Sequence, residues 1–241
     1  MKKLKEYIKE SILGDWNDVN ADEISEKQQR TEVEDFLKEN YQGKFRISPK
    51  LNKQGLFEVS SYGDAILKKS IPNLTNDKFI FTHINGDFII RLRDIVSLAG
   101  CPKYVVGCFN CEYCNMLTSL EGAPEKVGEL FSCSFCENLT SLEGSPKEVG
   151  KGFYCYGCES LTTLEGAPEK VGGGFSCSNC SSLKSLEGAP EKVGGDFNCS
   201  YCPSLKSLKG APKEVGGDFS CNNCKVNFTQ DDIDAVSVVK S

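Results

Sequence analysis

Apolar positions recur along most of this chain at a fixed interval of 22 residues, with polar residues between them. Three columns keep this interval: Phe109, Phe131, Phe153, Phe175, Phe197 and Phe219; Val105, Val127, Val149, Val171, Val193 and Val215; and Leu120, Leu142, Leu164, Leu186 and Leu208. A fixed period of this length is typical of a solenoid, in which each coil buries its apolar side only by stacking on its neighbours. The pattern therefore predicts a repeat solenoid.

Each unit contains the motif Phe-x-Cys, whose two named residues would share one side of a β-strand. We therefore expect one short strand per 22-residue coil, and stacked coils would pair these strands into a parallel sheet. The remainder of the unit is too short and too rich in Gly and Pro for a helix of several turns. It should form turns, 3₁₀ helix or extended chain. The predicted fold class is a leucine-rich-repeat-like solenoid.

The repeat extends beyond its most regular part. Residues 84–90 copy the segment before the first cysteine, with Ile90 in the cysteine position, so we expect about seven coils over residues 77–228. Residues 229–232 offer a capping box, and the apolar residues after them lie three apart. A short capping helix is expected over residues 229–241.

The part of the chain before the repeats has a different pattern. Residues 1–14 place Leu4, Tyr7, Ile8 and Ile12 on one face, which predicts an amphipathic helix. Residues 15–29 are polar and indicate a linker. Residues 30–76 contain one helical pattern and several alternating segments, so we expect a small α+β cap on the first coil.

Composition and charge narrow the possible partners. The 241 residues are 39% hydrophobic and carry a net charge of -6, which suits a folded core. No stretch approaches the roughly 18 apolar residues of a membrane helix, and the charged start is unlike a signal peptide. Without a basic patch, nucleic acid is an unexpected partner. We expect a cytoplasmic monomer that binds neither nucleic acid nor membrane.

Cysteine is the unusual component, with fourteen residues against a single histidine. Twelve form six C-x-x-C pairs, one per coil: Cys111 and Cys114, Cys133 and Cys136, Cys155 and Cys158, Cys177 and Cys180, Cys199 and Cys202, Cys221 and Cys224. Such pairs could hold zinc between coils or form disulfides. A shared metal should impose a 44-residue alternation, which is absent. We favour a structural ladder of buried thiols without metal or cofactor.

Enzyme chemistry has little support in the sequence. The cysteine pairs follow a strand and run into a loop, whereas a reactive pair needs a helix N-terminus or nearby positive charge. Gly172 to Gly174 lack the Lys and Ser or Thr of a phosphate-binding loop. We therefore expect no catalytic activity.

The unit LTSLEGAPEKVGGDFxCxxC resembles the leucine-rich-repeat-like proteins of tailed phages of gut bacteria, including crAss-like phages. The segments MKKLKEYIKESIL, FEVSSYGDAILKKS and FTQDDIDAV are similar to the non-repeat parts of such proteins, so the resemblance covers nearly the whole chain. It implies a fold and a phage setting, because most members have no assigned activity. The chain departs from standard leucine-rich repeats by Gly-Gly before Phe and by Cys in place of Asn.

The predicted function is a non-enzymatic protein-protein interaction scaffold in the cytoplasm of an infected bacterium. Residues that alternate with the core positions should form an exposed sheet face. Its candidate binding residues are Asn110, Glu112, Tyr154, Tyr156 and Asn198, because tyrosine is enriched at interfaces.

Two alternatives remain open. The start MKKLKEYIKE is similar to capsid-targeting peptides of some tailed phages, whose protease cuts after a hydrophobic-x-Glu triplet such as Ile8-Lys9-Glu10. The protein would then be a virion component. The other alternative is a zinc-binding C-x-x-C repeat protein.

Overall fold

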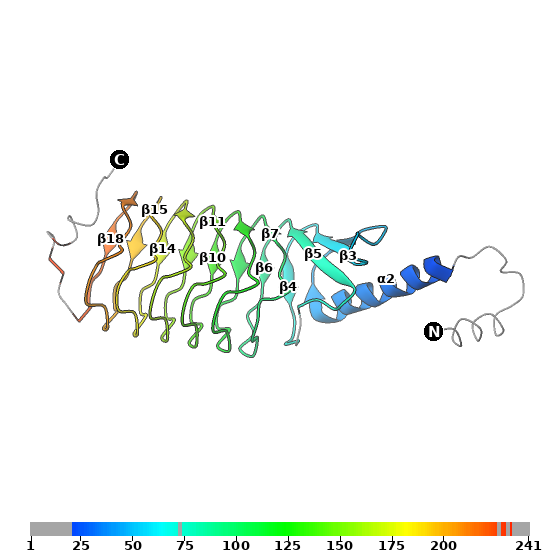
Figure 1. The fold of residues 1–241 in the computed structure, drawn as a ribbon, viewed down its shortest axis with the longest axis horizontal. Helices are drawn as coiled ribbons and strands as arrows, with labels where there is room; N and C mark the ends of the chain where they lie inside the picture. The colour runs from blue at the N-terminus through cyan, green and yellow to red at the C-terminus, as the bar shows by residue number, and fades with distance from the viewer. Residues whose placement is uncertain (1–20, 72–73, 226–227, 230–231, 233–241) are drawn as a thin grey trace, which may run out of the picture.

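The chain winds into a β-solenoid of about seven turns with roughly 22 residues per coil (Figure 1). This computed structural model describes residues 21–71, 74–225, 228–229 and 232. The predicted solenoid with its short parallel strand in every coil is therefore confirmed. The expected helices over residues 1–14 and 229–241 fall mostly or wholly outside the described residues.

Two sheets of nine strands run along the solenoid. In order along the first sheet, the strands are β1 (Tyr41–Gln42), β4 (Ala65–Leu67), β6 (Phe88–Ile89), β8 (Phe109–Asn110), β10 (Phe131–Ser132), β12 (Phe153–Tyr154), β14 (Phe175–Ser176), β16 (Phe197–Asn198) and β18 (Phe219–Ser220). Along the second sheet they are β2 (Phe45–Ile47), β3 (Phe57–Ser61), β5 (Phe79–Ile84), β7 (Tyr104–Val105), β9 (Lys126–Val127), β11 (Glu148–Val149), β13 (Lys170–Val171), β15 (Lys192–Val193) and β17 (Glu214–Val215).

The second strand of each coil lies where turns, 3₁₀ helix or extended chain were expected. It forms around the valine column, in which Val127 and its equivalents are buried while the preceding Lys126 or Glu148 is exposed. This alternation suits a strand with one buried side. Two residues are enough to form each of these strands, because every strand pairs in register with its equivalent in both neighbouring coils.

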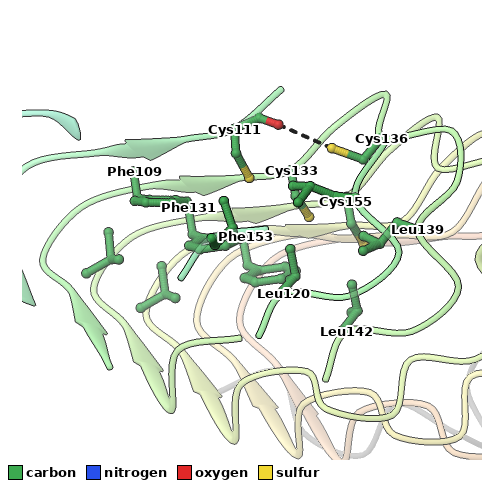
Figure 2. Packing of buried hydrophobic residues seen from close by; sticks show 14 of the residues in the cluster. Phe109, Cys111, Leu120, Phe131, Cys133, Cys136, Leu139, Leu142, Phe153 and Cys155 are labelled. Carbon is green, nitrogen blue, oxygen red and sulfur yellow. Dashed lines mark hydrogen bonds between the residues drawn. The ribbon is translucent and has the colours of Figure 1, made fainter. Parts of the chain in front are cut away.

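Stacked aromatic rings fill the middle of the solenoid (Figure 2). The ring centroids of Phe131 and Phe153 are 5.0 Å apart and their planes differ by 1°. Phe109 and Phe175 continue the stack on either side at 5.0 and 5.3 Å. Leu120 and its equivalents close the core from the opposite wall. From Phe88 to Phe219, each coil thus contributes one ring to a continuous stack.

A column of glycines sets how closely the coils approach at the turn after the second sheet. A Cβ atom added at Gly150 would lie 1.9 Å from the carbonyl oxygen of Gly128 in the preceding coil. The same clash recurs at Gly172, Gly194 and Gly216, at 2.1 to 2.3 Å. From Gly150 to Gly216 only glycine fits without a shift, because backbone lies directly against backbone, whereas Val106 takes the equivalent position near the start of the array.

The N-terminal part differs from the expectation in its first helix. Helix α2 spans Ala21–Asn40 and so occupies much of the segment 15–29 that was expected to be a linker. Residues 21–29 are rich in good helix formers. They show no apolar periodicity, and the helix residues that the structure places in the core, Val33 and Leu37, belong to its later turns.

The boundary between cap and solenoid also differs from the expectation. Strands β3 and β4 pair in parallel with β5 and β6, so the coil pattern begins at Phe57 rather than at residue 77. This coil was hidden in the sequence because Ala65 takes the position of Phe88. Only β1 and β2 pair antiparallel, and they end the two sheets beside α2.

At the other end, the predicted capping box is present in the described residues. The backbone N–H of Asp232 donates to Thr229 Oγ1 at 3.2 Å, and the backbone N–H of Thr229 donates to Asp232 Oδ2 at 2.8 Å. Within the part of the chain that the structure covers, no helix is both long and apolar enough to cross a membrane.

Candidate functional site

The twelve paired cysteines are all buried, and the two members of each pair have different roles. The first cysteine of each pair is buried in the core, as Figure 2 shows for Cys111, Cys133 and Cys155 beside the phenylalanine stack. The second donates its thiol proton to a backbone carbonyl of the preceding coil. These Sγ to oxygen distances are 2.9 Å for Cys114 to Ile90, 3.2 Å for Cys136 to Cys111, 3.2 Å for Cys158 to Cys133, 3.3 Å for Cys180 to Cys155, 3.2 Å for Cys202 to Cys177 and 3.4 Å for Cys224 to Cys199.

The surroundings of Cys111, Cys114 and Cys133 favour the protonated form of their thiols. The pKa of the Cys111 thiol lies well above its ordinary value. The largest cause is a hydrogen bond with Cys136, and the second largest is burial. Burial raises the pKa of Cys133 strongly and raises that of Cys114 to about 12. A thiol must keep its proton to donate it, and a thiolate is the reactive form of cysteine. The ladder is thus suited to stacking the coils rather than to redox chemistry.

The geometry of the ladder also bears on the zinc and disulfide alternatives. All fourteen cysteines are free thiols in the structure. Among the residues that it describes, no three Cys, His, Asp or Glu side chains converge into a possible metal site. Thiol titration and metal analysis distinguish the two alternatives from a ladder of free thiols.

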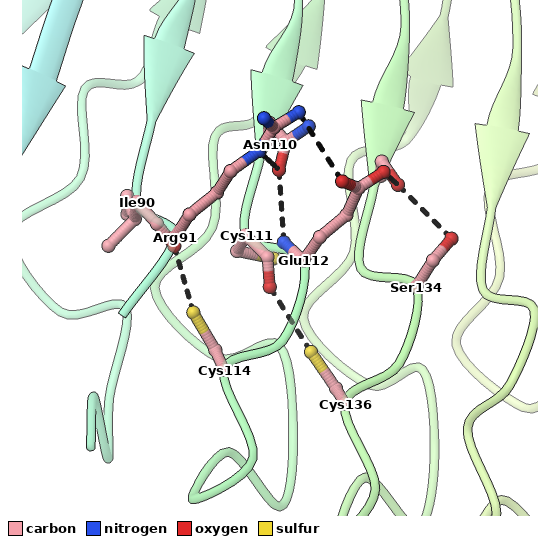
Figure 3. Close-up of polar contacts among 9 residues, drawn as sticks. Ile90, Arg91, Asn110, Cys111, Glu112, Cys114, Ser134 and Cys136 are labelled. Carbon is pink, nitrogen blue, oxygen red and sulfur yellow. Dashed lines mark hydrogen bonds and ion pairs between the residues drawn. The ribbon is translucent and has the colours of Figure 1, made fainter. Parts of the chain in front are cut away.

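Two of the five candidate binding residues meet in a polar network on the first sheet (Figure 3). Arg91 Nε donates to Asn110 Oδ1 at 3.2 Å, and Arg91 Nη2 lies 3.3 Å from Glu112 Oε2. The Glu112 backbone N–H also donates to Asn110 Oδ1 at 3.0 Å, and Ser132 Oγ donates to Glu112 Oε1 at 2.8 Å. The network fixes the orientation of both candidate residues.

The expectation that this sheet face is exposed is wrong in part. Asn110 is only 9% exposed, and Ser132, Ser134 and Ser200 are buried as well. Coils stack so closely that side chains of adjacent coils cover a small residue between them. Asn110 therefore acts within the network and offers little surface to a partner.

The two candidate tyrosines are half-buried, and their rings lie against different neighbours. Tyr154 lies over Gly152, where an added Cβ would be 2.9 Å from Tyr154 Cζ. Tyr156 instead packs edge-on against Phe135, with ring centroids 5.0 Å apart. Asn198 is half-buried two coils away, where its Oδ1 accepts from the backbone N–H of Ser200 at 2.9 Å. The five residues thus form no single patch.

The structure reveals an aromatic feature that was missed, at the residue before the second cysteine of each pair. Tyr113, Phe135 and Tyr201 occupy this position with φ of 62°, 59° and 60°. Left-handed backbone is unfavourable for bulky residues. Tyr113 and Tyr201 are nevertheless 43% and 55% exposed.

A signal for this position was present in the sequence. The equivalent residues in other coils are Gly157, Asn179 and Asn223, which are the types that adopt left-handed backbone most readily. Glycine and asparagine in this column indicate a turn with left-handed backbone. The aromatic residues in the same column are therefore unusual for their position.

Three aromatic residues from successive coils form a continuous group, here called the aromatic strip: Tyr113, Phe135 and Tyr156. The rings of Tyr113 and Phe135 stack with centroids 4.8 Å apart and planes 10° apart. Phe135 joins them to Tyr156. The strip borders the Arg91 and Glu112 network, since Glu112 directly precedes Tyr113.

Comparison of the chain with family models, with curated proteins and with solved structures found no match to any of them. The site is therefore interpreted from its own geometry.

Proposed function

We propose that the protein is a non-enzymatic interaction scaffold that binds a protein partner through the aromatic strip. The observation that carries this proposal is the left-handed backbone of Tyr113 and Phe135. Glycine or asparagine would stabilise the turn better, as other coils show with Gly157 and Asn179. Strained residues that the fold does not require are characteristic of functional sites.

The surroundings of the strip support protein binding. Tyrosine and arginine are enriched among residues that contribute most to interfaces, and aromatic side chains lose little conformational entropy on binding. Arg91 and Glu112 are held in place beside Tyr113 by the polar network. Because neighbouring coils also hold the rings against one another, the surface is ordered before a partner arrives.

The cellular setting is proposed from the sequence resemblance. A phage-encoded protein acting in the cytoplasm of an infected bacterium agrees with the repeat unit and with the flanking segments. The virion-component alternative depends on residues 1–14, which lie outside the described residues.

The test uses substitutions that suit the turn. Tyr113→Asn with Phe135→Asn places a residue already found in this column at both positions, so the melting temperature should stay constant or rise. Capture of host or phage proteins from an infected-cell lysate by the immobilised full chain should fall at least tenfold for the specific partner. Tyr201→Asn is the matched control, because this residue lies outside the strip.

Quantitative mass spectrometry compares the proteins bound by each variant. A partner set that is unchanged by Tyr113→Asn with Phe135→Asn, in a protein that melts normally, would remove the aromatic strip as the binding surface.

A further inference from the structure

Five successive segments that link the first sheet to the second, from the link after β8 to the link after β16, form a separate surface, here called the loop face: residues 115–121, 137–143, 159–165, 181–187 and 203–209. Figure 1 shows these segments stacked side by side along the solenoid. The loop face contains none of the residues of the aromatic strip. Any binding through it is thus independent of the proposed function.

Charge is segregated along the loop face. Its first three segments carry Glu121, Glu137, Glu143, Glu159 and Glu165 and no lysine or arginine. Its last segment carries Lys206 and Lys209 and no acidic residue, and the segment between them carries Lys184 and Glu187. All these side chains belong to exposed residues. The face is therefore acidic at one end and basic at the other.

Most of these charges form no ion pair with another residue that the structure describes. In the described residues, only Lys209 and Glu187 of the loop face form an ion pair, with 2.7 Å between Nζ and Oε1. Equivalent positions of adjacent coils are only about 4.8 Å apart, so the rows of glutamates repel one another.

The second sheet shows that the fold can avoid such repulsion. There, lysine and glutamate of adjacent coils pair directly: Lys103 with Glu125 at 3.4 Å, Lys126 with Glu148 at 3.1 Å, Lys192 with Glu214 at 2.7 Å and Lys213 with Glu191 at 2.7 Å. Four ion pairs thus join neighbouring coils along the second sheet, although Lys170 and Lys192 also lie opposite each other there, whereas opposite charges on the loop face are mostly separated by several coils. An external surface with the opposite order of charge would neutralise them.

We propose that this external surface is the loop face of a second copy of the chain, bound antiparallel in a two-fold dimer. A two-fold axis between the segments 159–165 and 181–187 places segment 137–143 of one copy opposite segment 203–209 of the other. Glu137 and Glu143 then face Lys206 and Lys209, and the same contacts form twice by symmetry. Glu159 faces Lys184 in the same way.

The expected dimer is weak and sensitive to salt. The five segments span only about 24 Å at the coil spacing, which places the interface at the small end of specific contacts. Its charges are exposed, so salt that shortens the Debye length to about 3 Å at 1 M should dissociate it. A dimer differs from the monomer expected from the sequence, because the placement of these charges on one face becomes apparent only when the coils are stacked.

Sedimentation velocity of the full chain tests the assembly directly. The dimer should form at about 0.02 M salt and give way to monomer at about 1 M. A monomer at every salt concentration would overturn the proposal. A series of species larger than the dimer would overturn the closed two-fold arrangement.

Charge reversal tests the contacts. Glu137→Lys with Glu159→Lys reverses two charges in the acidic half of the loop face, and Lys184→Glu with Lys206→Glu reverses the two lysines that would lie opposite them. Each variant should dimerise at least tenfold more weakly than the native chain. An equimolar mixture of the two should form a heterodimer, because each face now complements the other.

The matched control for the glutamate variant is Glu58→Lys with Glu169→Lys, which makes the same change in net charge at one exposed residue of β3 and one that directly precedes β13. This control should dimerise like the native chain, and melting curves of all variants check that they are folded. If either reversed variant remains dimeric, or if the mixture gives no heterodimer, the loop face is not the dimer interface.

Discussion

The Sγ atom of Cys136 donates a hydrogen bond to the carbonyl oxygen of Cys111, 3.2 Å away in the preceding coil. This contact joins the two roles of the cysteine pair. The Cys111 side chain fills the core beside the phenylalanine stack. The Cys136 thiol provides a hydrogen-bond donor for the Cys111 carbonyl group, which lies where the turn after the strand begins. A small side chain with one donor fits both requirements in a dry core, where an unpaired carbonyl would be costly.

Removing one donor from the ladder should destabilise the solenoid. Cys158→Ala leaves the carbonyl of Cys133 without the thiol that now lies 3.2 Å from it, and also creates a small cavity. We expect a loss of about 2 to 3 kcal/mol in the free energy of unfolding, measured by urea titration. Ser160→Ala, in the half-buried loop of the same coil, should change it by less than about 0.5 kcal/mol. If Cys158→Ala lowers the free energy of unfolding no more than Ser160→Ala does, the thiol contact contributes nothing to stability.

The thiol ladder predicts fourteen titratable cysteines and no bound metal. Denatured protein, purified without reductant, should react with a thiol reagent at all fourteen cysteines. Elemental analysis of the native protein should give less than about one zinc per ten chains. Far fewer thiols would indicate disulfides, and zinc near one per two coils would establish the metal alternative.

Stability should fall as the pH rises into the alkaline range. Burial raises the pKa of Cys114 to about 12 and that of Cys202 to about 11. Their ordinary value is near 9, so above that pH the unfolded chain releases thiol protons that the folded chain retains. The stabilisation is complete below about pH 9 and is lost as the pH rises towards the folded values, at about 1.4 kcal/mol per pH unit for each thiol.

Urea unfolding under reducing conditions at a series of pH values from 8 to about 10.5 measures this effect. The double variant Cys114→Ala with Cys202→Ala should show a shallower decline than the native chain. A stability that is flat or rises over this range would contradict the protonated ladder.

The aromatic stack should dominate the packing energy of each coil. Phe153 is fully buried between Phe131 and Phe175, so Phe153→Ala should destabilise the protein by about 3 to 5 kcal/mol. Tyr154→Ala, one residue further on, removes a half-buried ring and should have a much smaller effect. Thermal melting compares the two, and similar losses would contradict the assignment of inward and outward positions.

The two candidate tyrosines should now differ in binding. Tyr156→Ser removes one member of the aromatic strip and should weaken capture of the partner by about 1 kcal/mol or more. Tyr154→Ser changes a ring that lies over Gly152 and should leave capture unchanged. The exposed residues Glu125 and Lys126 of the return side serve as a second control. If Tyr154→Ser weakens capture and Tyr156→Ser does not, the binding surface lies nearer Gly152 than the aromatic strip.

The repeat itself made the solenoid predictable. The Phe and Val columns give inward positions directly, because every coil presents the same pattern to the same neighbours. The coil at Phe57 escaped recognition since Ala65 replaces the ring that defines the repeat. Helix α2 was hidden because its first half has no apolar face to produce periodicity.

The candidate site was harder to predict than the fold. Alternation along a strand correctly placed Asn110 opposite the core, but it could not show that the closely stacked neighbouring coils bury this residue. Tyr113 and Phe135 were missed because they belong to a turn, where alternation has no meaning. Only the backbone conformation, with φ near 60°, distinguishes them from ordinary exposed residues.

The glycine column from Gly128 to Gly216 also limits how the length of this protein can change. An added Cβ in this column would meet the carbonyl oxygen of the coil before it. A one-residue insertion between the valine and phenylalanine columns would bring a side chain into that position in the coil that contains it. An insertion of 22 residues instead adds one complete coil, which stacks on its neighbours in the same register. The array can therefore lengthen by whole coils, and the intervals of 23 residues from Ala65 to Phe88 and of 21 residues from Phe88 to Phe109 show that single residues are accommodated before the glycine column begins.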